Sequence, residues 1–400
     1  MIYRDFQDMK LSALGFGSMR LPVADGNDAQ IDEAAALAMV DYALAHGVNY
    51  FDIAWGYHSG NSELVMGKAL ARYPREKFFL ATKFPGYDLA NMDKVEAIFE
   101  KQLEKCRVDY FDFYLFHNVC EMNIDAYLDP RYGIHDYLMR QKASGRIRHL
   151  GFSAHGAYPV LKRFLDAYGK DMEFCQLQIN YLDWDFQDAK AKVELLKEHS
   201  IPVWVMEPLR GGKLAHLAPE YEARLKALRP QESIPAWAFR FLQSLPTVAV
   251  TLSGMSNMEQ IKANIAIFEE DKPLTATEME ALLAIAREMT QKIALPCTAC
   301  HYCVSHCPQG LDYRASWNFT TNTALPAAAS SPPWPSPPCP RTSCPAPASA
   351  AAAARPSARS RSRYPKPWRT LPKSCVAEER TQSASARGDA LFDSGRRSKR

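Results

Sequence analysis

The feature that most constrains the fold is an alternation of short apolar runs with longer amphipathic stretches, repeated eight times within residues 1–290. The apolar runs predict buried strands at residues 13–21, 48–54, 78–84, 110–117, 149–153, 174–179, 203–206 and 248–252. The amphipathic stretches predict helices at residues 32–46, 62–73, 92–105, 134–144, 158–168, 188–199, 234–243 and 275–289. Parallel strands joined in this way by helices predict an α/β fold, a closed (β/α)8 TIM barrel.

The competing fold is an open doubly wound sheet, which normally carries the pattern G-x-G-x-x-G after its first strand. The chain has GFGSMR at residues 15–20, which lacks the third glycine, so we favour the barrel. Two helix starts carry capping signals. Ser62 precedes an acidic first turn, and Thr275 with Glu278 has the spacing of a capping box.

Polar side chains stand at the carboxyl ends of the second, third and fourth expected strands, where barrels place their catalytic groups. These residues are Asp52 with Tyr57 just beyond it, Lys83 and His117. A lysine at the end of a buried strand is costly unless it is paired, and Asp52 is its natural partner. Taken singly, Tyr57 also fits a loop tyrosine and His117 a core histidine, but four such residues at successive strand ends favour one shared site.

Residues 1–290 resemble the aldo-keto reductases, because several separated motifs occur in the same order. The motifs are MIYRDFQDMKLSALGFGSMRLP, HGVNYFDIAWGYHSGNSELVMGKAL, FFLATKFP, VDYFDFYLFHN, GRIRHLGFSAH and SGMSNMEQIKANI. The resemblance implies an oxidoreductase that reduces a small aldehyde or ketone with NADPH, or with NADH. It also implies that the catalytic tetrad is Asp52, Tyr57, Lys83 and His117.

The tetrad makes chemical sense for carbonyl reduction, which needs a proton donor. Tyr57 is a usable acid only if the pKa of its hydroxyl, about 10 in free tyrosine, is lowered. A neighbouring Lys83 ammonium favours tyrosinate and lowers that pKa. Asp52 would hold Lys83 in place, and His117 would orient the carbonyl oxygen beside Tyr57.

The same resemblance implies three groups of cofactor-binding residues. The nicotinamide would contact Ser153, Gln178 and Met206, although the family commonly has Asn where this chain has Ala154 and an aromatic residue in place of Met206. The segment MEPLRGGKL resembles a pyrophosphate loop with contacts from Leu209, Gly211 and Lys213, and with charge from Arg210 and Lys213. The adenosine phosphate would lie at a short helix whose contacts are Ser253, Gly254, Asn257, Gln260 and Asn264.

Other residues near these motifs allow more than one interpretation. Lys262 is the one positive charge in the segment expected at the adenosine phosphate, so the choice between NADPH and NADH stays open. His58 and His155 fit either the wall of a substrate pocket or exposed loops. Cys106, Cys120 and Cys175 lie within helix and strand patterns and are interpreted as core thiols.

A run of four cysteines follows the last expected helix, in the pattern C-x2-C-x2-C-x3-C-P of bacterial ferredoxins. It predicts a partial [4Fe–4S] segment at residues 291–324 with the ligands Cys297, Cys300, Cys303 and Cys307. A zinc site is the alternative, but zinc motifs usually use two separated C-x2-C pairs. A subgroup of aldo-keto reductases resembles this chain in carrying such a module. The cluster would be structural or would serve a redox partner protein.

A second cysteine run should complete a two-cluster module, and none follows. Residues 325–400 hold 13 of the 27 prolines and 14 basic against 4 acidic residues. One choice of codons for residues 347–363, read one base earlier, encodes ACIGCRSCEAVCPQQIK, which contains the missing run. We interpret residues 325–400 as an unstructured product of a frameshift between about residues 322 and 347. A disordered basic tail is the alternative.

Charge and hydropathy exclude several function classes. Residues 1–324 hold 34 basic and 41 acidic residues, the wrong sign for a nucleic-acid binder. No run of 18 apolar residues predicts a membrane span, and the opening MIYRDFQDMK lacks the apolar region of a secretory signal. Together with the ten cysteines, this favours a cytoplasmic protein with metal or thiol chemistry. The rival function is a non-catalytic nicotinamide sensor or electron-transfer subunit that uses the barrel as a docking platform.

Overall fold

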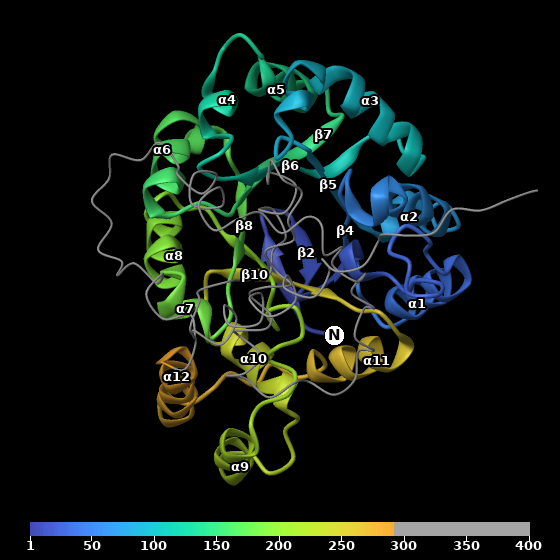
Figure 1. Ribbon diagram of the computed structural model, residues 1–400. Helices are drawn as coiled ribbons and strands as arrows, with labels where there is room; N and C mark the ends of the chain where they lie inside the picture. Colours follow the sequence, from blue (N-terminus) through green and yellow to red (C-terminus); the bar gives the residue numbers. More distant parts are fainter. Residues whose placement is uncertain (292–400) are drawn as a thin grey trace, which may run out of the picture. The chain divides into compact units, whose positions relative to one another are not determined.

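The computed structural model of the protein describes residues 1–291, and within them the predicted barrel is confirmed (Figure 1). Eight parallel strands close into a ring. In order around the barrel they are β10 (Val248–Gly254), β3 (Leu14–Gly17), β4 (Tyr50–Asp52), β5 (Phe79–Phe84), β6 (Phe111–Val119), β7 (Ile147–Ala154), β8 (Phe174–Gln178) and β9 (Val203–Met206).

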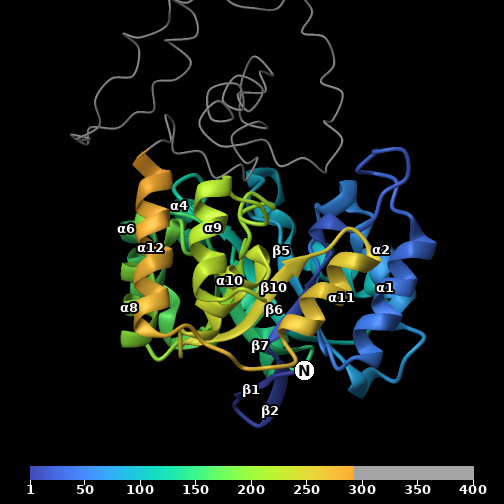
Figure 2. The same cartoon turned by 90° about the horizontal axis from the view of Figure 1, so that it is seen from below.

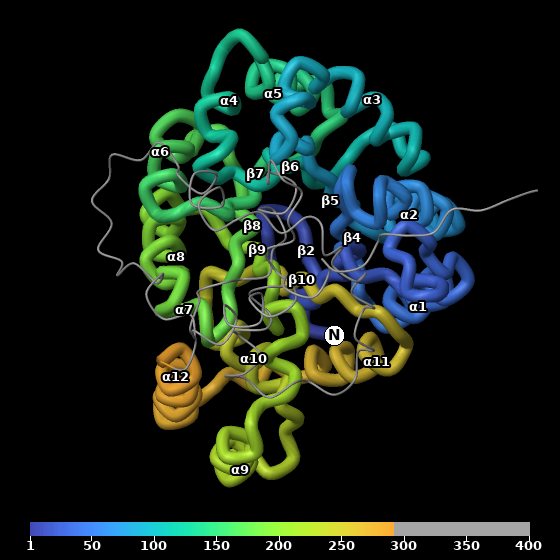
Figure 3. The backbone as a smooth tube through the Cα atoms, in the orientation of Figure 1, coloured from blue at the N-terminus to red at the C-terminus, as the bar shows by residue number. Residues whose placement is uncertain are grey.

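Helices surround the strands, and around the ring they follow the order of the sequence except for α12, which lies between α8 and α10 (Figure 3). They are α1 (Glu33–Ala45), α2 (Ser62–Leu70), α3 (Val95–Cys106), α5 (Ile134–Ala143), α6 (Tyr158–Tyr168), α8 (Ala189–Glu198), α10 (Ile234–Gln243), α11 (Met258–Ile267) and α12 (Ala276–Gln291). Three further helices lie in the connections: α4 (Ile124–Leu128), α7 (Asp183–Phe186) and α9 (Pro219–Leu228). Within residues 1–291, no helix is both long and apolar enough to cross a bilayer.

An antiparallel hairpin of β1 (Tyr3–Phe6) and β2 (Met9–Ser12) was not expected from the sequence. Figure 2 shows it at one end of the barrel. Phe6 is buried, and its ring centre lies 5.7 Å from that of Phe113 and 5.0 Å from that of Trp204 inside the barrel. The amino-terminal end of the barrel is therefore plugged, and aromatic side chains fill the interior beneath the carboxyl ends of the strands.

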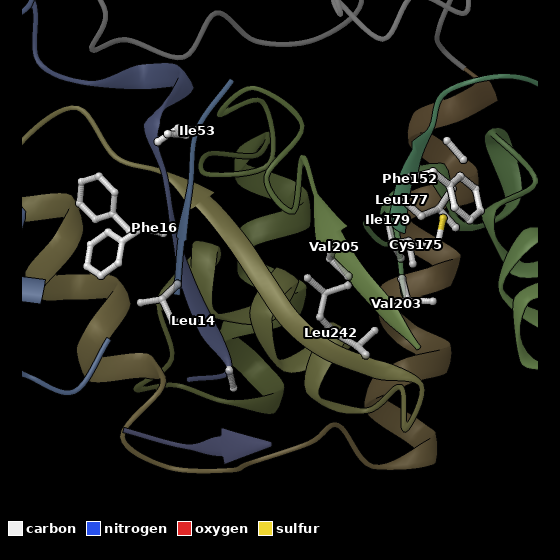
Figure 4. Packing of buried hydrophobic residues seen from close by; sticks show 14 of the residues in the cluster. Leu14, Phe16, Ile53, Phe152, Cys175, Leu177, Ile179, Val203, Val205 and Leu242 are labelled. Atoms are coloured by element: carbon white, nitrogen blue, oxygen red, sulfur yellow. The ribbon is translucent and has the colours of Figure 1, made fainter. Parts of the chain in front are cut away.

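A second apolar layer lies between the strands and the helices (Figure 4). Alternate strand residues point outward into it, among them Phe16, Phe152 and Leu177. Cys175 and Cys106 belong to the same layer, and burial raises the pKa of both thiols well above the ordinary range. This agrees with their interpretation as core residues, whereas Cys120 is only half-buried.

The two predicted helix caps have different outcomes. The capping box is confirmed, because Glu278 Oε2 accepts from Thr275 N at 2.8 Å and Thr275 Oγ1 accepts from Glu278 N at 3.3 Å. The prediction for Ser62 is wrong. Asn61 precedes α2, and Ser62 lies inside the helix, where its hydroxyl donates to Ser18 Oγ at 2.8 Å.

Glu278 also accepts two hydrogen bonds from Arg229, a link between α9 and α12 that makes stability depend on pH. Those bonds, above all, lower the pKa of Glu278 from 4.5 to about 2. A carboxyl whose pKa is depressed on folding stabilises the protein above pH 4.5 and loses that contribution as the pH falls toward 2. Glu278→Gln should therefore be less stable than the wild type at pH 7, with a difference that narrows toward pH 3. Urea unfolding at both pH values measures it, and a difference that stays constant would contradict the assignment.

Candidate active site

The centre of the candidate site is a buried ion pair between neighbouring strands. Lys83 at the end of β5 is 1% exposed, and its Nζ lies 2.5 Å from Oδ1 of Asp52 at the end of β4. Lys83 Nζ also donates to Ile53 O at 2.9 Å. Burial raises the pKa of Asp52 and lowers the pKa of Lys83, and the attraction between the two charges opposes both shifts.

Tyr57 and His117 lie beside this pair, so the structure brings all four predicted tetrad residues together. Lys83 Nζ is 5.2 Å from the centre of the Tyr57 ring. The rings of Tyr57 and His117 meet edge to face, with centres 6.2 Å apart. Tyr87 packs against His117 in the same way at 5.2 Å. A half-buried phenol thus lies beside both an ammonium and an imidazole at the carboxyl end of the barrel.

The turn that presents Tyr57 is anchored by its neighbour His58. His58 and Ser59 have left-handed backbones, with φ of 53° and 56°. The His58 ring is buried, its Nε2 accepts from Leu21 N at 3.1 Å, and its Nδ1 lies 2.8 Å from Asp28 O. His58 is therefore a structural anchor, neither a pocket wall nor an exposed loop residue.

His117 is an uncharged side chain in the candidate site. Burial, followed by the nearby charges of Lys83 and His155, lowers the pKa of His117 well below its usual range. The pKa of His155 is itself lowered to about 3 by burial. Nδ1 of His117 is buried without a hydrogen-bond partner within residues 1–291. Both histidines are thus uncharged at neutral pH.

Two residues that the sequence analysis missed lie next to the tetrad. Gln176 on β8 is buried and donates to Asp52 Oδ2 at 3.4 Å. Asn118 follows His117 at an irregularity of β6 and has φ of 61°. Its side-chain amide is buried, and neither of its polar atoms has a partner in the described part of the chain. Gln176 precedes Gln178 by two residues on β8, so the two side chains are expected on the same face of the strand, and this spacing is the signal that would have found it.

The residues predicted at the nicotinamide lie on three adjacent strands. Ser153 on β7 is fully buried, and its Oγ accepts from Asn118 N at 2.7 Å. Gln178 on β8 is partnered in register with Met206 on β9, and both are half-buried. Gln178 Nε2 donates to Oδ2 of Asp183 at 2.8 Å.

The loop after β9 departs from expectation at one residue. Leu209 and Lys213 are half-buried, whereas Gly211 is exposed with φ of 65°. The predicted role of Arg210, a positive charge that binds the pyrophosphate, does not fit the structure. Its side chain is 2% exposed, and its Nε pairs with Asp183 at 3.1 Å. The loop is tied to the segment after β8 through this buried pair.

The segment after β10 contains the remaining predicted residues. Ser253 is buried and accepts from Asn264 Nδ2 at 3.1 Å, and Gly254 is exposed. Asn257 caps α11 by accepting from Gln260 N at 2.9 Å. The Nζ atom of Lys262 on α11 is 5.6 Å from the centre of the Tyr42 ring.

A cation missed by the sequence analysis stands between these two segments. A Cβ at Gly254 would lie 3.1 Å from Arg20 Cγ, and a Cβ at Gly211 would lie 3.3 Å from an Arg20 guanidinium nitrogen. The Arg20 side chain is 44% exposed and lies 3.5 Å from Glu207. Arg20 lies three residues after the end of the first barrel strand. A search of the polar residues that follow each strand would therefore have found it. The predicted metal ligands, Cys297, Cys300, Cys303 and Cys307, lie outside the described residues.

Comparison with known proteins identifies the family. The family model described as "Aldo/keto reductase family" matches residues 13–287. The chain belongs to the aldo/keto reductase family. It is therefore an oxidoreductase.

Several known proteins are similar to the chain over nearly their whole length. An uncharacterized oxidoreductase of Bacillus subtilis, YqkF, is 25% identical, with 69% of this chain and 92% of that protein covered. The NADH-specific methylglyoxal reductase of Escherichia coli is 23% identical, with 72% and 97% covered. The solved holo form of an aldo-keto reductase from Bacillus halodurans is 27% identical, with a TM-score of 0.58 and 71% and 96% covered.

The Asp183–Arg210 pair of this reductase predicts a strong dependence of stability on each partner. Arg210→Met should lower the free energy of unfolding by about 3–5 kcal/mol, because Asp183 keeps a buried, uncompensated charge. Adding Asp183→Asn should recover much of that loss. Urea unfolding of both single variants and the double variant measures the coupling. Lys162→Met, which breaks the exposed pair with Asp166, is the control and should cost less than about 1 kcal/mol. Additive losses in the double variant would contradict the prediction.

Proposed function

We propose that the protein reduces a small aldehyde or ketone by hydride transfer from a nicotinamide cofactor, with Tyr57 as the proton donor. The observation that carries this proposal is the buried Asp52–Lys83 pair, whose ammonium lies 5.2 Å from the Tyr57 ring. A cation at that position stabilises tyrosinate and makes the hydroxyl a stronger acid. Asp52 holds the cation in place.

His117 has a separate role in this proposal. Because burial keeps its imidazole uncharged, it acts through hydrogen bonding and not as a proton source. Its ring lies edge to face with Tyr57, so a carbonyl oxygen at the Tyr57 hydroxyl comes within reach of His117. The two side chains would fix the orientation of the carbonyl before the proton moves.

The cofactor, when bound, supplies the hydride, and the residues present fit a nicotinamide dinucleotide. Ser153, Gln178 and Met206 stand on adjacent strands beside the tetrad and would hold the nicotinamide. Gly211 and Gly212, with φ of 65° and 88°, leave the backbone open to a pyrophosphate. Arg20 adds a positive charge near this loop and near the segment expected to bind the adenosine phosphate, whose contacts would be Ser253, Gly254, Asn257, Gln260 and Asn264.

The names of related proteins support a nicotinamide cofactor but leave its phosphate open. One relative is called NADH-specific, and a solved aldo-keto reductase from Klebsiella pneumoniae was crystallised with NADPH. Leu209 and Lys213 would complete the pyrophosphate site. We propose NADPH, with NADH as a usable alternative.

Tyr57→Phe tests the proposal. The variant should abolish reduction of a probe aldehyde such as 4-nitrobenzaldehyde, because no hydroxyl remains to donate the proton. NADPH affinity, measured by quenching of intrinsic fluorescence, should stay within a few-fold, since the phenyl ring still fills the same space. Wild-type turnover in the variant would remove Tyr57 as the acid. Tight NADPH binding without turnover of any carbonyl by the wild type would favour a cofactor-sensing or electron-transfer subunit instead.

We further propose that residues 291–324 form a partial ferredoxin-like segment and that residues 325–400 replace its second half. In a two-cluster module the fourth cysteine of each run ligates the other cluster. Cys297, Cys300 and Cys303 would then lack a fourth thiolate, and Cys307 would lack a cluster. A cluster held by three thiolates is labile.

Iron content tests this module. Anaerobic reconstitution of the chain as printed should give substoichiometric, oxygen-labile iron. A chain with the reading frame restored after about residue 322 should bind about eight irons in two [4Fe–4S] centres. Iron and acid-labile sulfide assays measure both. A stable four-iron cluster in the chain as printed would show that Cys307 or a later cysteine completes the site, and the two-cluster interpretation would be wrong.

A further inference from the structure

A buried polar cluster lies on the outer side of β5, behind the candidate site. Glu63 on α2 is fully buried, and its Oε2 lies 2.6 Å from Nζ of Lys105 on α3, whose side chain is 10% exposed. The other carboxylate oxygen of Glu63 accepts from Thr82 Oγ1 at 2.9 Å and from Gln102 Nε2 at 2.8 Å. These four side chains, called here the Glu63 cluster, join two helices to one barrel strand.

The Glu63 cluster holds the backbone of the residue that carries the site's ammonium. Gln102 Nε2 donates to the carbonyl oxygen of Lys83 at 3.0 Å. Gln102 Oε1 accepts from the hydroxyl of Tyr114 at 2.7 Å, which fixes the orientation of the amide. The backbone of Lys83 is thus held by a hydrogen bond from α3 as well as by the neighbouring strands.

The same cluster reaches the turn that presents Tyr57. Lys105 Nζ lies 4.7 Å from the centre of the Trp55 ring, a cation–π contact two residues before Tyr57. On the other side of the turn, Glu63 is the second residue of α2, which begins at Ser62. The segments before and after Tyr57 are therefore held by the two members of one ion pair.

Two ion pairs of residues 1–291 lie around Tyr57, and each balances its own charge. Lys83 and Asp52 face it from β5 and β4, with the neutral His117 on β6 and with Tyr87 packed against His117. Glu63 and Lys105 lie behind them on α2 and α3. In a water-poor interior a single unpaired charge acts over a longer distance than in solvent. Removal of one member of either pair would leave a net charge near Tyr57.

We propose that the Glu63–Lys105 ion pair is a positioning device that holds Lys83 and the Tyr57 turn in their relative places and keeps the charge behind them neutral. Glu63 and Lys105 act through other residues, because their contacts run to Thr82, Gln102 and Trp55. The proposal rests on the proposed function, in which Tyr57 donates the proton.

The experiment compares Glu63→Gln, Lys105→Met and the double variant. Lys105→Met leaves a net negative charge and should raise the pKa of Tyr57 by about one unit, whereas Glu63→Gln leaves a net positive charge and should lower it by about one unit. The double variant carries neither charge and should return toward the wild-type value. Lys101→Met, also on α3 but paired at the surface with Glu104, is the matched control and should change nothing.

Two readouts report the pKa. The first is the pH dependence of kcat for 4-nitrobenzaldehyde with NADPH. The second is the tyrosinate absorbance on pH titration, taken as the difference between each protein and the same protein with Tyr57→Phe. Thermal unfolding is recorded in parallel, because both single variants should also be less stable.

Opposite shifts that cancel in the double variant would support the proposal. Loss of stability with no shift, or with shifts of the same sign, would mean that the ion pair is only structural, and the proposal would be overturned. If the proposed function itself were wrong, the result would be distinguishable, because the Tyr57→Phe variant would then keep wild-type turnover. The tyrosinate titration would in that case still decide whether the pair controls Tyr57.

Discussion

The candidate site depends on one interaction, the ion pair of Lys83 with Asp52. An ammonium that is 1% exposed is expensive to bury, and it is tolerated because a carboxylate and a backbone carbonyl lie within hydrogen-bond distance. The barrel supplies those partners, since β4 and β5 are neighbours and Asp52 is in register with Ala81, two residues before Lys83. Tyr57, His117 and Gln176 are all arranged with respect to this pair. Without it, the polar residues at this end of the barrel would have no common centre.

The barrel was predictable because each strand is short, apolar and followed by an amphipathic helix. β9 was predicted to the residue, and β5 to within one residue at its start. The hairpin β1–β2 was not predicted, because its strands of four residues carry charges such as Arg4, Asp5 and Lys10, and Phe6 and Leu11 are the only apolar side chains in them that are buried. The capping box at Thr275 was predictable from local spacing, whereas the start of α2 after Asn61 was not, because the Ser62 hydroxyl donates to Ser18 Oγ, 44 residues away.

The proximity of Asp52, Lys83 and His117 was predictable for a geometric reason, since the ends of parallel strands meet whatever their separation in sequence. What the sequence could not show is which charges are already paired. Arg210 follows a strand and precedes two glycines, features that suit a phosphate ligand, yet its guanidinium pairs with Asp183 in the segment that follows β8. Glu63 and Lys105 look like ordinary helix charges until α2 and α3 pack together. Pairing between distant segments is a tertiary property and leaves no local pattern.

The hairpin that plugs the barrel has a consequence for how the site exchanges protons with water. Phe6, Phe113 and Trp204 fill the interior below the ion pair, so no polar path leads from Lys83 to the amino-terminal end through these side chains. In the proposed function, Tyr57 would therefore regain its proton from the carboxyl end of the barrel, the end at which a substrate would bind. Reprotonation of Tyr57 and release of the product would then take place at the same end of the barrel.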